Sequence, residues 1–236
     1  MHLPRPRPWL FFLEGWEVIQ ALPFQDRTDA GRQLADHLDV YSGRTDVLVL
    51  ALPRGGVAVG VQVARRLGVP LDVILVRKLG VPGHEEFAMG AIASGGVRIL
   101  SDDVVTALGV SERDVALVAA AEEAELARRE RIYERSGAPR IAGRTIILVD
   151  DGLATGATMR AAAVVIRGQS PARLVVAVPV APRETCVALR GEVDEVVCLA
   201  TPDPFHSVGS WYEDFRQFTD EEVRQMLIPE PSRPRA

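Results

Sequence analysis

The fold is decided by the stretch Ile146-Ile-Leu-Val149 followed at once by Asp150-Asp-Gly-Leu-Ala-Thr-Gly-Ala-Thr158. Four consecutive apolar residues predict a strand that is buried on both faces, as strands of parallel sheets are. A helix is predicted shortly after the loop, at residues 161–167. In open parallel sheets, ligands bind beyond the carboxyl ends of the strands. The loop that leaves this strand is therefore the first candidate for a binding site.

The same alternation of buried strand and helix extends along the chain. Further strands are predicted at 47–52, 71–76, 174–178 and 195–200, and further helices at 30–38, 57–67 and 184–189. About five short strands alternating with helices indicate an α/β fold with a parallel, doubly wound sheet. Apolar segments at 88–93 and 97–100 flank Ser-Gly-Gly and predict a hairpin. A long helix predicted from Ser111 to Arg135 is a candidate hood subdomain or dimer surface.

Two adjacent carboxylates, Asp150 and Asp151, stand at the end of the central strand. They repel each other and resist desolvation, so a ligand that uses both is expected. A vicinal diol can donate one hydrogen bond to each, and such charge-assisted bonds contribute roughly 1.5–3 kcal/mol apiece. Thr155-Gly-Ala-Thr158 then offers two hydroxyls and the first N–H groups of a helix, which suit a phosphate. This order of features fits a ribose 5-phosphate.

The segment from Ile146 to Met159 closely resembles the signature of type I phosphoribosyltransferases, which bind phosphoribosyl pyrophosphate (PRPP). The resemblance implies that Asp150 and Asp151 are catalytic, bind the ribose hydroxyls, and meet Mg²⁺ through water. A strand–turn–helix that is merely capped by Asp and Thr is the alternative. The implied ribose-5-phosphate loop consists of Asp150, Asp151, Gly152, Leu153, Ala154, Thr155, Gly156, Ala157 and Thr158.

A second glycine-containing loop, Pro53-Arg-Gly-Gly56, follows the first predicted strand. Its two glycines allow a tight turn that presents N–H groups to an anion. Type I phosphoribosyltransferases have a pyrophosphate-binding loop at this point, often with unusual peptide geometry. The resemblance therefore assigns pyrophosphate binding to Arg54, Gly55 and Gly56, and a plain tight turn is the alternative.

Two adjacent cations, Arg77 and Lys78, follow the second predicted strand. Cations at a strand end can neutralise a departing pyrophosphate, so both are candidate catalytic residues and Lys78 a pyrophosphate ligand. Residues 80–86, Gly-Val-Pro-Gly-His-Glu-Glu, resemble the family's mobile catalytic loop. For His84, Glu85 and Glu86 a solvated position is the favoured interpretation.

Aromatic residues are concentrated at 205–215, where Trp211 or Tyr212 could stack on a nucleobase or pack against the core. Ala154 stands where hypoxanthine-guanine enzymes usually carry an acid, so the base is not identified beyond a purine-like heterocycle. The implied activity is transfer of a 5-phosphoribosyl group from PRPP to a nitrogenous base. A PRPP-sensing regulator without transfer activity and a PRPP hydrolase are the alternatives.

The 236-residue composition fits one globular domain, expected at 23–228 between tails at 1–22 and 229–236. A net charge of −5 argues against a nucleic-acid or anionic-membrane surface. The apolar run at 9–13 is too short for a membrane span or a signal segment. Cys186 and Cys198 are expected to be thiols rather than a disulfide, which favours the cytoplasm. A homodimer is expected from the family alone.

Overall fold

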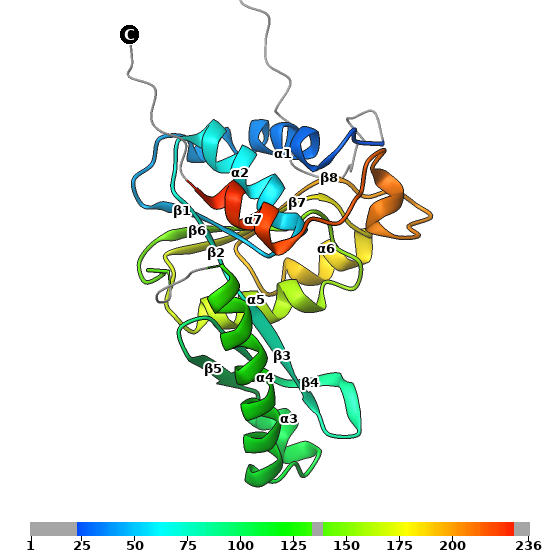
Figure 1. Ribbon diagram of the computed structural model, residues 1–236. Helices are drawn as coiled ribbons and strands as arrows, with labels where there is room; N and C mark the ends of the chain where they lie inside the picture. The colour runs from blue at the N-terminus through cyan, green and yellow to red at the C-terminus, as the bar shows by residue number, and fades with distance from the viewer. Residues whose placement is uncertain (1–22, 134–138, 229–236) are drawn as a thin grey trace, which may run out of the picture.

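The computed structural model describes residues 23–133 and 139–228, apart from the side chains of 85–87. The expected tails at 1–22 and 229–236 lie outside the described residues. The main body is a sheet covered by helices on both faces, and a smaller subdomain projects from one end of it (Figure 1).

The main sheet has five strands in the order β2-β1-β6-β7-β8, and every neighbouring pair is parallel. This confirms the predicted doubly wound sheet and its number of strands. In chain order the strands are β1 (Val47–Ala51), β2 (Leu71–Val73), β6 (Thr145–Val149), β7 (Arg173–Val180) and β8 (Glu195–Ala200).

Helices α1 and α2 cover one face of the sheet, and α5 and α6 cover the other (Figure 1). The last helix, α7, packs against α2. None of the helices in the described ranges combines the length and the apolar character needed to cross a membrane. The helices are α1 (Arg27–Asp36), α2 (Gly55–Leu67), α5 (Ala157–Arg167), α6 (Arg183–Leu189) and α7 (Asp220–Leu227), with short 3₁₀ turns at Asp39–Tyr41 and Val208–Trp211.

Alternate side chains of each central strand enter two different apolar cores. In β6, Ile146 and Leu148 pack with the α5 side, whereas Ile147 and Val149 pack with the α1 and α2 side. All four are fully buried, which explains why the strand reads as an unbroken apolar run. Cys186 lies in the first of these cores, and both cysteines are free thiols, as predicted.

The projecting subdomain consists of an antiparallel sheet, in the order β3-β4-β5, and two helices (Figure 1). The predicted hairpin and long helix are confirmed within it. Ser111 caps the long helix, because its hydroxyl accepts a hydrogen bond from the backbone N–H of Asp114. The elements are β3 (Val76–Val81), β4 (His84–Ala93), β5 (Val97–Leu100), α3 (Asp102–Ala107) and α4 (Glu112–Ile132).

The prediction of one strand over residues 71–76 was wrong. The parallel strand β2 ends at Val73, and Val76 begins β3, which pairs with Ala93 of β4 instead. Arg77 and Lys78 therefore lie inside a strand of the subdomain and not at a carboxyl end of the main sheet. The predicted loop at 80–86 is largely strand as well, because Gly83, at φ +76°, allows β3 and β4 to be joined by a tight turn.

Candidate active site

The two glycine-containing loops leave the sheet side by side. Strands β1 and β6 are parallel neighbours, and Ala51 lies opposite Val149. The pairing continues for one more residue, since the N–H of Leu52 donates to the carbonyl of Val149 over 2.9 Å. Residues 53–56 and 150–158 therefore begin at the same edge of the sheet, where the topology favours a ligand.

The glycines of the first loop pack directly against the two acids of the second. A Cβ atom at Gly55 would lie 1.8 Å from Oδ2 of Asp151, and one at Gly56 would lie 2.9 Å from Cα of Asp150. The peptide bond between Pro53 and Arg54, just before them, is cis. Gly56 is thus required by the close approach of the backbone at Val149 and Asp150, and Gly55 by the side chains of Asp151 and Arg27.

Asp151 forms a buried ion pair that the sequence does not reveal. Its Oδ2 accepts a hydrogen bond of 2.6 Å from Nε of Arg27, and the two side chains are only 15% and 7% exposed. A carboxylate and a guanidinium that have both lost most of their water depend on each other for charge compensation. Arg27 therefore holds Asp151 in place at the strand end.

Arg27 is itself fixed by the segment after the last strand. Its Nη1 donates to the carbonyl of Arg216 over 2.9 Å, and its guanidinium lies 3.8 Å from the ring centroid of Phe215. Stacking of this kind suits the planar guanidinium and not an ammonium group. Arg27 and Asp151 are 124 positions apart in the sequence, and no local motif connects them.

Tyr212 fixes the backbone of the acid loop, the loop that carries Asp150 and Asp151. Its hydroxyl donates a 2.5 Å hydrogen bond to the backbone carbonyl of Asp151, and its ring packs between Phe24 and Phe215. The residue is 6% exposed, and burial together with the charge of Asp151 raises the pKa of the phenol. Trp211, the other candidate for a base contact, is partly buried beside Phe205.

Tyr212→Phe should lower the free energy of unfolding by about 0.5–1.5 kcal/mol, because it removes one hydrogen bond and keeps the packed ring. Urea denaturation of the two proteins measures the difference. Tyr41→Phe is a suitable comparison, since it removes a bond of 2.6 Å to Glu195, the first residue of β8 and thus at the other end of the parallel strands from the acid pair. Only Tyr212→Phe should also weaken PRPP binding. Equal binding by both variants would contradict the supporting role of Tyr212.

Asp150 differs electrostatically from its neighbour. Burial of its carboxyl group, and then the adjacent charge of Asp151, raise the pKa of Asp150 well above its usual range. Its Oδ1 accepts a 2.9 Å hydrogen bond from the N–H of Asp151, an interaction that does not need the charge. In the protein without ligand, ionising Asp150 is therefore costly.

Asp150→Asn should stabilise the ligand-free protein at neutral pH by about 1 kcal/mol or more. The folded protein holds the Asp150 proton more tightly than the unfolded chain does. The contribution of Asp150 to the parent's free energy of unfolding is thus greatest below the ordinary aspartate pKa of about 3.9. It is lost as the pH rises towards the pKa that Asp150 has in the folded protein. The advantage of the Asn variant should grow over the same interval. Urea denaturation from pH 4 to pH 8 measures it.

The comparison for this prediction is Glu123→Gln, which removes one exposed carboxylate from the middle of α4. This variant should show no growing advantage over the parent with pH. A constant difference between Asp150→Asn and the parent across the range would contradict the raised pKa of Asp150.

The Thr/Gly loop carries its two hydroxyls on the surface, and its glycine is buried. Gly156 precedes α5 with φ +73°, a left-handed conformation that glycine adopts without steric cost. Thr155 and Thr158 are exposed beside the free end of the helix. Thr185 of α6 donates to the carbonyl of Ala154 over 2.8 Å and so anchors the loop from behind. The arrangement suits an anion at the start of α5.

The two subdomain cations do share a cleft with this loop. A cleft of about 510 Å³ is lined by Arg77 and Lys78 of β3, by Glu122 of α4, and by Ala157 and Thr158 of α5. Nε of Arg77 lies 2.5 Å from a carboxylate oxygen of Glu122, so its charge is already partly compensated. Arg54 lies elsewhere, with its guanidinium 3.3 Å from the side-chain oxygen of Gln217. Sequence reasoning missed Arg27, Glu122 and Thr185.

The adjacent acids, the glycines packed against them and the Thr/Gly turn at the start of α5 lie together at one edge of the α/β sheet. The sequence profile described as a phosphoribosyl transferase domain matches residues 24–214. The chain therefore belongs to the phosphoribosyl transferase domain family.

Known proteins agree with this assignment. A curated Mycobacterium tuberculosis protein, whose name includes the words phosphoribosyl transferase, is 49% identical over 208 residues, which make up 86% of this chain. The chain spans about half the length of that relative, 46%. The crystal structure of TT1426 from Thermus thermophilus superposes with a TM-score of 0.78 at 42% identity, covering 87% of this chain and 97% of the other.

Proposed function

We propose that the protein transfers a 5-phosphoribosyl group from PRPP to a nitrogenous base, most suitably a purine-like one, and releases pyrophosphate. The observation that carries the proposal is the contact between two loops, in which Gly55 and Gly56 pack within van der Waals distance of Asp151 and Asp150. This contact brings the proposed pyrophosphate loop and the proposed ribose loop to one edge of the sheet. PRPP has both groups on adjacent parts of one molecule.

The carboxylates of Asp150 and Asp151 would accept hydrogen bonds from the ribose hydroxyls. The exposed Thr155 and Thr158, with the N–H groups that begin α5, would bind the 5-phosphate. During transfer the bond from C1 to pyrophosphate oxygen breaks, a bond from C1 to the base nitrogen forms, and C1 is inverted. The proton that the base nitrogen loses passes to solvent. Arg54 and Lys78 would stabilise the negative charge of the leaving group. The PRPP loop comprises Asp150, Asp151, Gly152, Leu153, Ala154, Thr155, Gly156, Ala157 and Thr158.

The proposal includes Mg²⁺, which enzymes of this family use with PRPP. Among the described residues no group of three or more His, Cys, Asp or Glu side chains forms a metal cage. Asp150 and Asp151 alone are a small oxygen donor set, which fits an ion held mainly by water and by substrate oxygens. Such an ion, when bound, supplies positive charge to the pyrophosphate. The proposed catalytic residues are Asp150, Asp151, Arg77 and Lys78.

For the base, we propose Trp211 as the contact and assign Tyr212 to supporting the acid loop. Tyr212 is buried and uses its hydroxyl on the carbonyl of Asp151, whereas Trp211 keeps part of its surface exposed. A homodimer in the cytoplasm is also proposed, and sedimentation of the purified chain would test the oligomeric state.

The test is pyrophosphate release from PRPP and Mg²⁺ with a panel of purines and pyrimidines, together with a control without base. We expect release that depends on one class of base and is lost in Asp150→Asn, a variant that the pKa argument expects to be stably folded. Tight PRPP binding with no turnover on any base would refute transfer and favour a sensor. Release that is equal without base would identify a hydrolase.

A further inference from the structure

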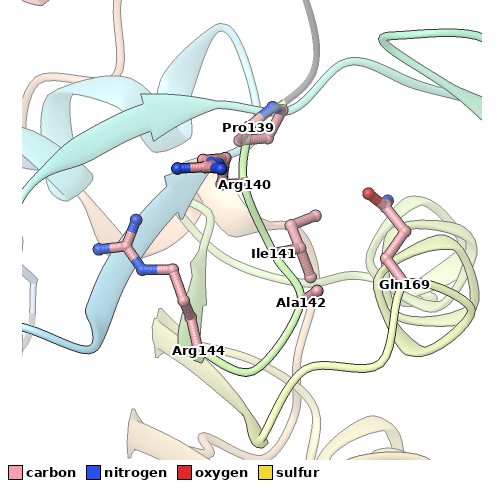
Figure 2. A pocket seen from close by; sticks show the side chains of 6 residues that line it. All are labelled: Pro139, Arg140, Ile141, Ala142, Arg144 and Gln169. Carbon is pink, nitrogen blue, oxygen red and sulfur yellow. The ribbon is translucent and has the colours of Figure 1, made fainter.

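A second cleft, of about 500 Å³, lies at the opposite edge of the sheet from the proposed PRPP site. Its lining residues precede Thr145, the first residue of β6, or follow α5, whereas Asp150 follows the last residue of β6. Five strand residues separate the two edges by roughly 16 Å. The cleft is lined by Pro139, Arg140, Ile141, Ala142, Arg144 and Gln169 (Figure 2).

Two guanidinium groups on the same side of this cleft lack carboxylate partners. Arg144 donates to two neutral acceptors, the carbonyls of Val47 at 2.8 Å and Asp46 at 3.5 Å. Arg140 is exposed. Within residues 23–133 and 139–228, neither arginine has a carboxylate at ion-pair distance. Their positive charge is therefore uncompensated, in a protein whose net charge is −5.

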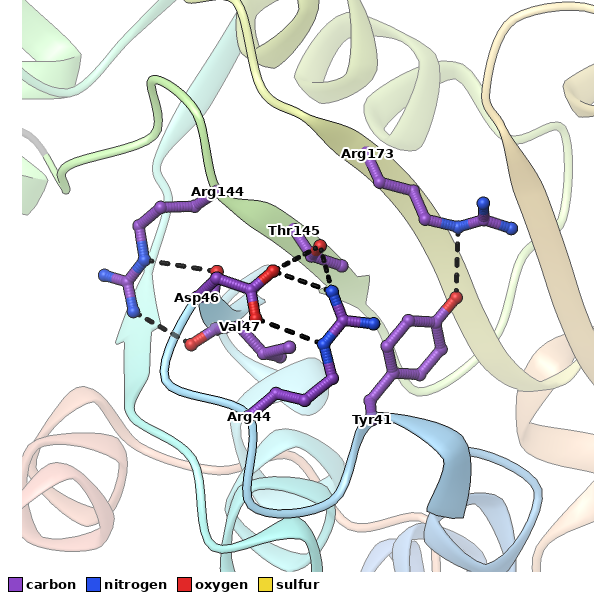
Figure 3. Close-up of polar contacts among 7 residues, drawn as sticks. All are labelled: Tyr41, Arg44, Asp46, Val47, Arg144, Thr145 and Arg173. Carbon is purple, nitrogen blue, oxygen red and sulfur yellow. Dashed lines mark hydrogen bonds and ion pairs between the residues drawn. The ribbon is translucent and has the colours of Figure 1, made fainter.

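Neighbouring arginines at the same edge are paired, which makes the contrast informative. Arg44 bonds to the carboxylate of Asp46 over 2.7 Å (Figure 3). Arg173 bonds to Glu195 over 2.9 Å. Arg144 lies beside this network but donates only to backbone oxygens, those of Asp46 and Val47 (Figure 3). Its guanidinium is held in position by those oxygens while its charge stays available to a ligand.

Backbone donors add to the positive character of the cleft. The N–H groups of Ile141 and Ala142 donate to no acceptor in the described part of the chain. The next N–H groups along the chain are satisfied, since that of Gly143 donates to the carbonyl of Ser170 over 2.9 Å. Unpaired N–H groups beside guanidinium groups are the usual partners of phosphate oxygens.

One feature opposes an anion here. Gln169 follows the carboxyl end of α5, where the helix dipole places roughly half a negative charge. Arg167 in the last turn of α5 offsets part of it, although that side chain also pairs with Asp194. The two full positive charges of Arg140 and Arg144 are larger than the half negative charge at the end of α5, so the cleft remains positive.

We propose that this cleft is a second anion site, which binds a compact diphosphate group, either free or as part of a nucleotide. A diphosphate can accept bonds from both guanidinium groups at once, and arginine suits such bidentate contacts. The volume lies within the range of small-molecule sites. The site is separate from the proposed PRPP loop and does not depend on transfer activity.

Calorimetric titration with pyrophosphate tests the proposal, with the parent compared with Arg140→Gln/Arg144→Gln. The parent should bind pyrophosphate at two sites, the proposed PRPP site and the cleft. The double variant should keep the affinity of the proposed PRPP site and bind pyrophosphate at the cleft at least about tenfold more weakly. A double variant matched in charge, Arg66→Gln/Arg128→Gln, changes two exposed arginines elsewhere and should keep both sites. Binding at the cleft should weaken when ionic strength rises from about 50 to about 200 mM.

Arg144 also ties the start of β1 to β6, so its loss could affect folding. Arg140→Gln alone removes no hydrogen bond or ion pair to a described residue. By itself it should weaken pyrophosphate binding at the cleft about tenfold while leaving PRPP-dependent turnover unchanged. Tighter binding of ADP than of pyrophosphate would assign a nucleotide, and equal binding would assign the diphosphate alone. Equal pyrophosphate binding by the parent and both cleft variants, or binding of an acidic peptide in its place, would refute the proposal.

Discussion

Gly55→Ala should reduce kcat/KM for PRPP by roughly 100-fold or more, since a displacement of about 1 Å at a reacting group already has an effect of that size. The added methyl group would lie 1.8 Å from Oδ2 of Asp151 and 2.9 Å from Nε of Arg27. Neither neighbour is the free end of a flexible side chain, because the two form a buried ion pair with each other. The carboxylate must therefore move away from its position at the strand end.

The measurement is steady-state pyrophosphate release with varied PRPP, together with calorimetric binding of PRPP. Gly191→Ala is the matched control, because its added methyl group would meet only one backbone oxygen, at an ordinary 3.6 Å. The control should behave as the parent does. If Gly55→Ala also retained the parent's kcat/KM, the two loops would not be parts of one site.

Arg27→Met should lower the free energy of unfolding by about 3–5 kcal/mol, the usual effect of removing one partner from a buried ion pair. Methionine keeps much of the aliphatic length of arginine but leaves Asp151 without its cation. Asp151 would then be a largely buried carboxylate without the guanidinium that compensates its charge. PRPP binding should weaken in parallel, since the acid pair loses its fixed geometry.

Urea denaturation measures this loss, and Arg66→Met provides the scale. Arg66 pairs with Asp36 and Asp39 on the surface, with all three side chains at least half exposed, so its loss should have an effect below about 1 kcal/mol. Arg27→Lys should not restore stability, because an ammonium cannot stack on Phe215 as the guanidinium does. Equal losses for Arg27→Met and Arg66→Met would show that the buried pair has no structural role.

Local sequence was sufficient for the sheet and for the loops that leave it. The apolar run of β6 and the Asp-Asp and Thr-Gly-Ala-Thr groups after it are contiguous, so their physical requirements can be read in one stretch. The close packing of Gly55 against Asp151 brings the two loops together, and the pyrophosphate role predicted for the glycine loop stays a prediction. The boundary of α5 was predicted four residues late, because Ala157 and Thr158 read as loop although they begin the helix.

What could not be predicted depends on contacts between distant segments. Arg27 looks like any polar residue at the start of a surface helix, and only the fold brings it to Asp151 and Phe215. The error at Val76 has a similar origin. The run from Leu71 to Val76 is apolar except for Asp72, so it reads as one strand. Val76 instead pairs with Ala93 of β4, a residue that lies outside the local sequence pattern. The cleft beside Arg77 and Lys78 and the cleft beside Arg140 and Arg144 are likewise formed by tertiary packing and could not be read from the sequence.

The order of synthesis has a consequence for the ion pair of Arg27 and Asp151. The ribosome produces Arg27 before Asp151, and Phe215 and the carbonyl of Arg216, which fix the guanidinium, are made after both. The central strands can pair on the nascent chain before that segment is available. The acid pair can therefore gain its final geometry only after residues 212–216 have docked against Phe24 and Arg27.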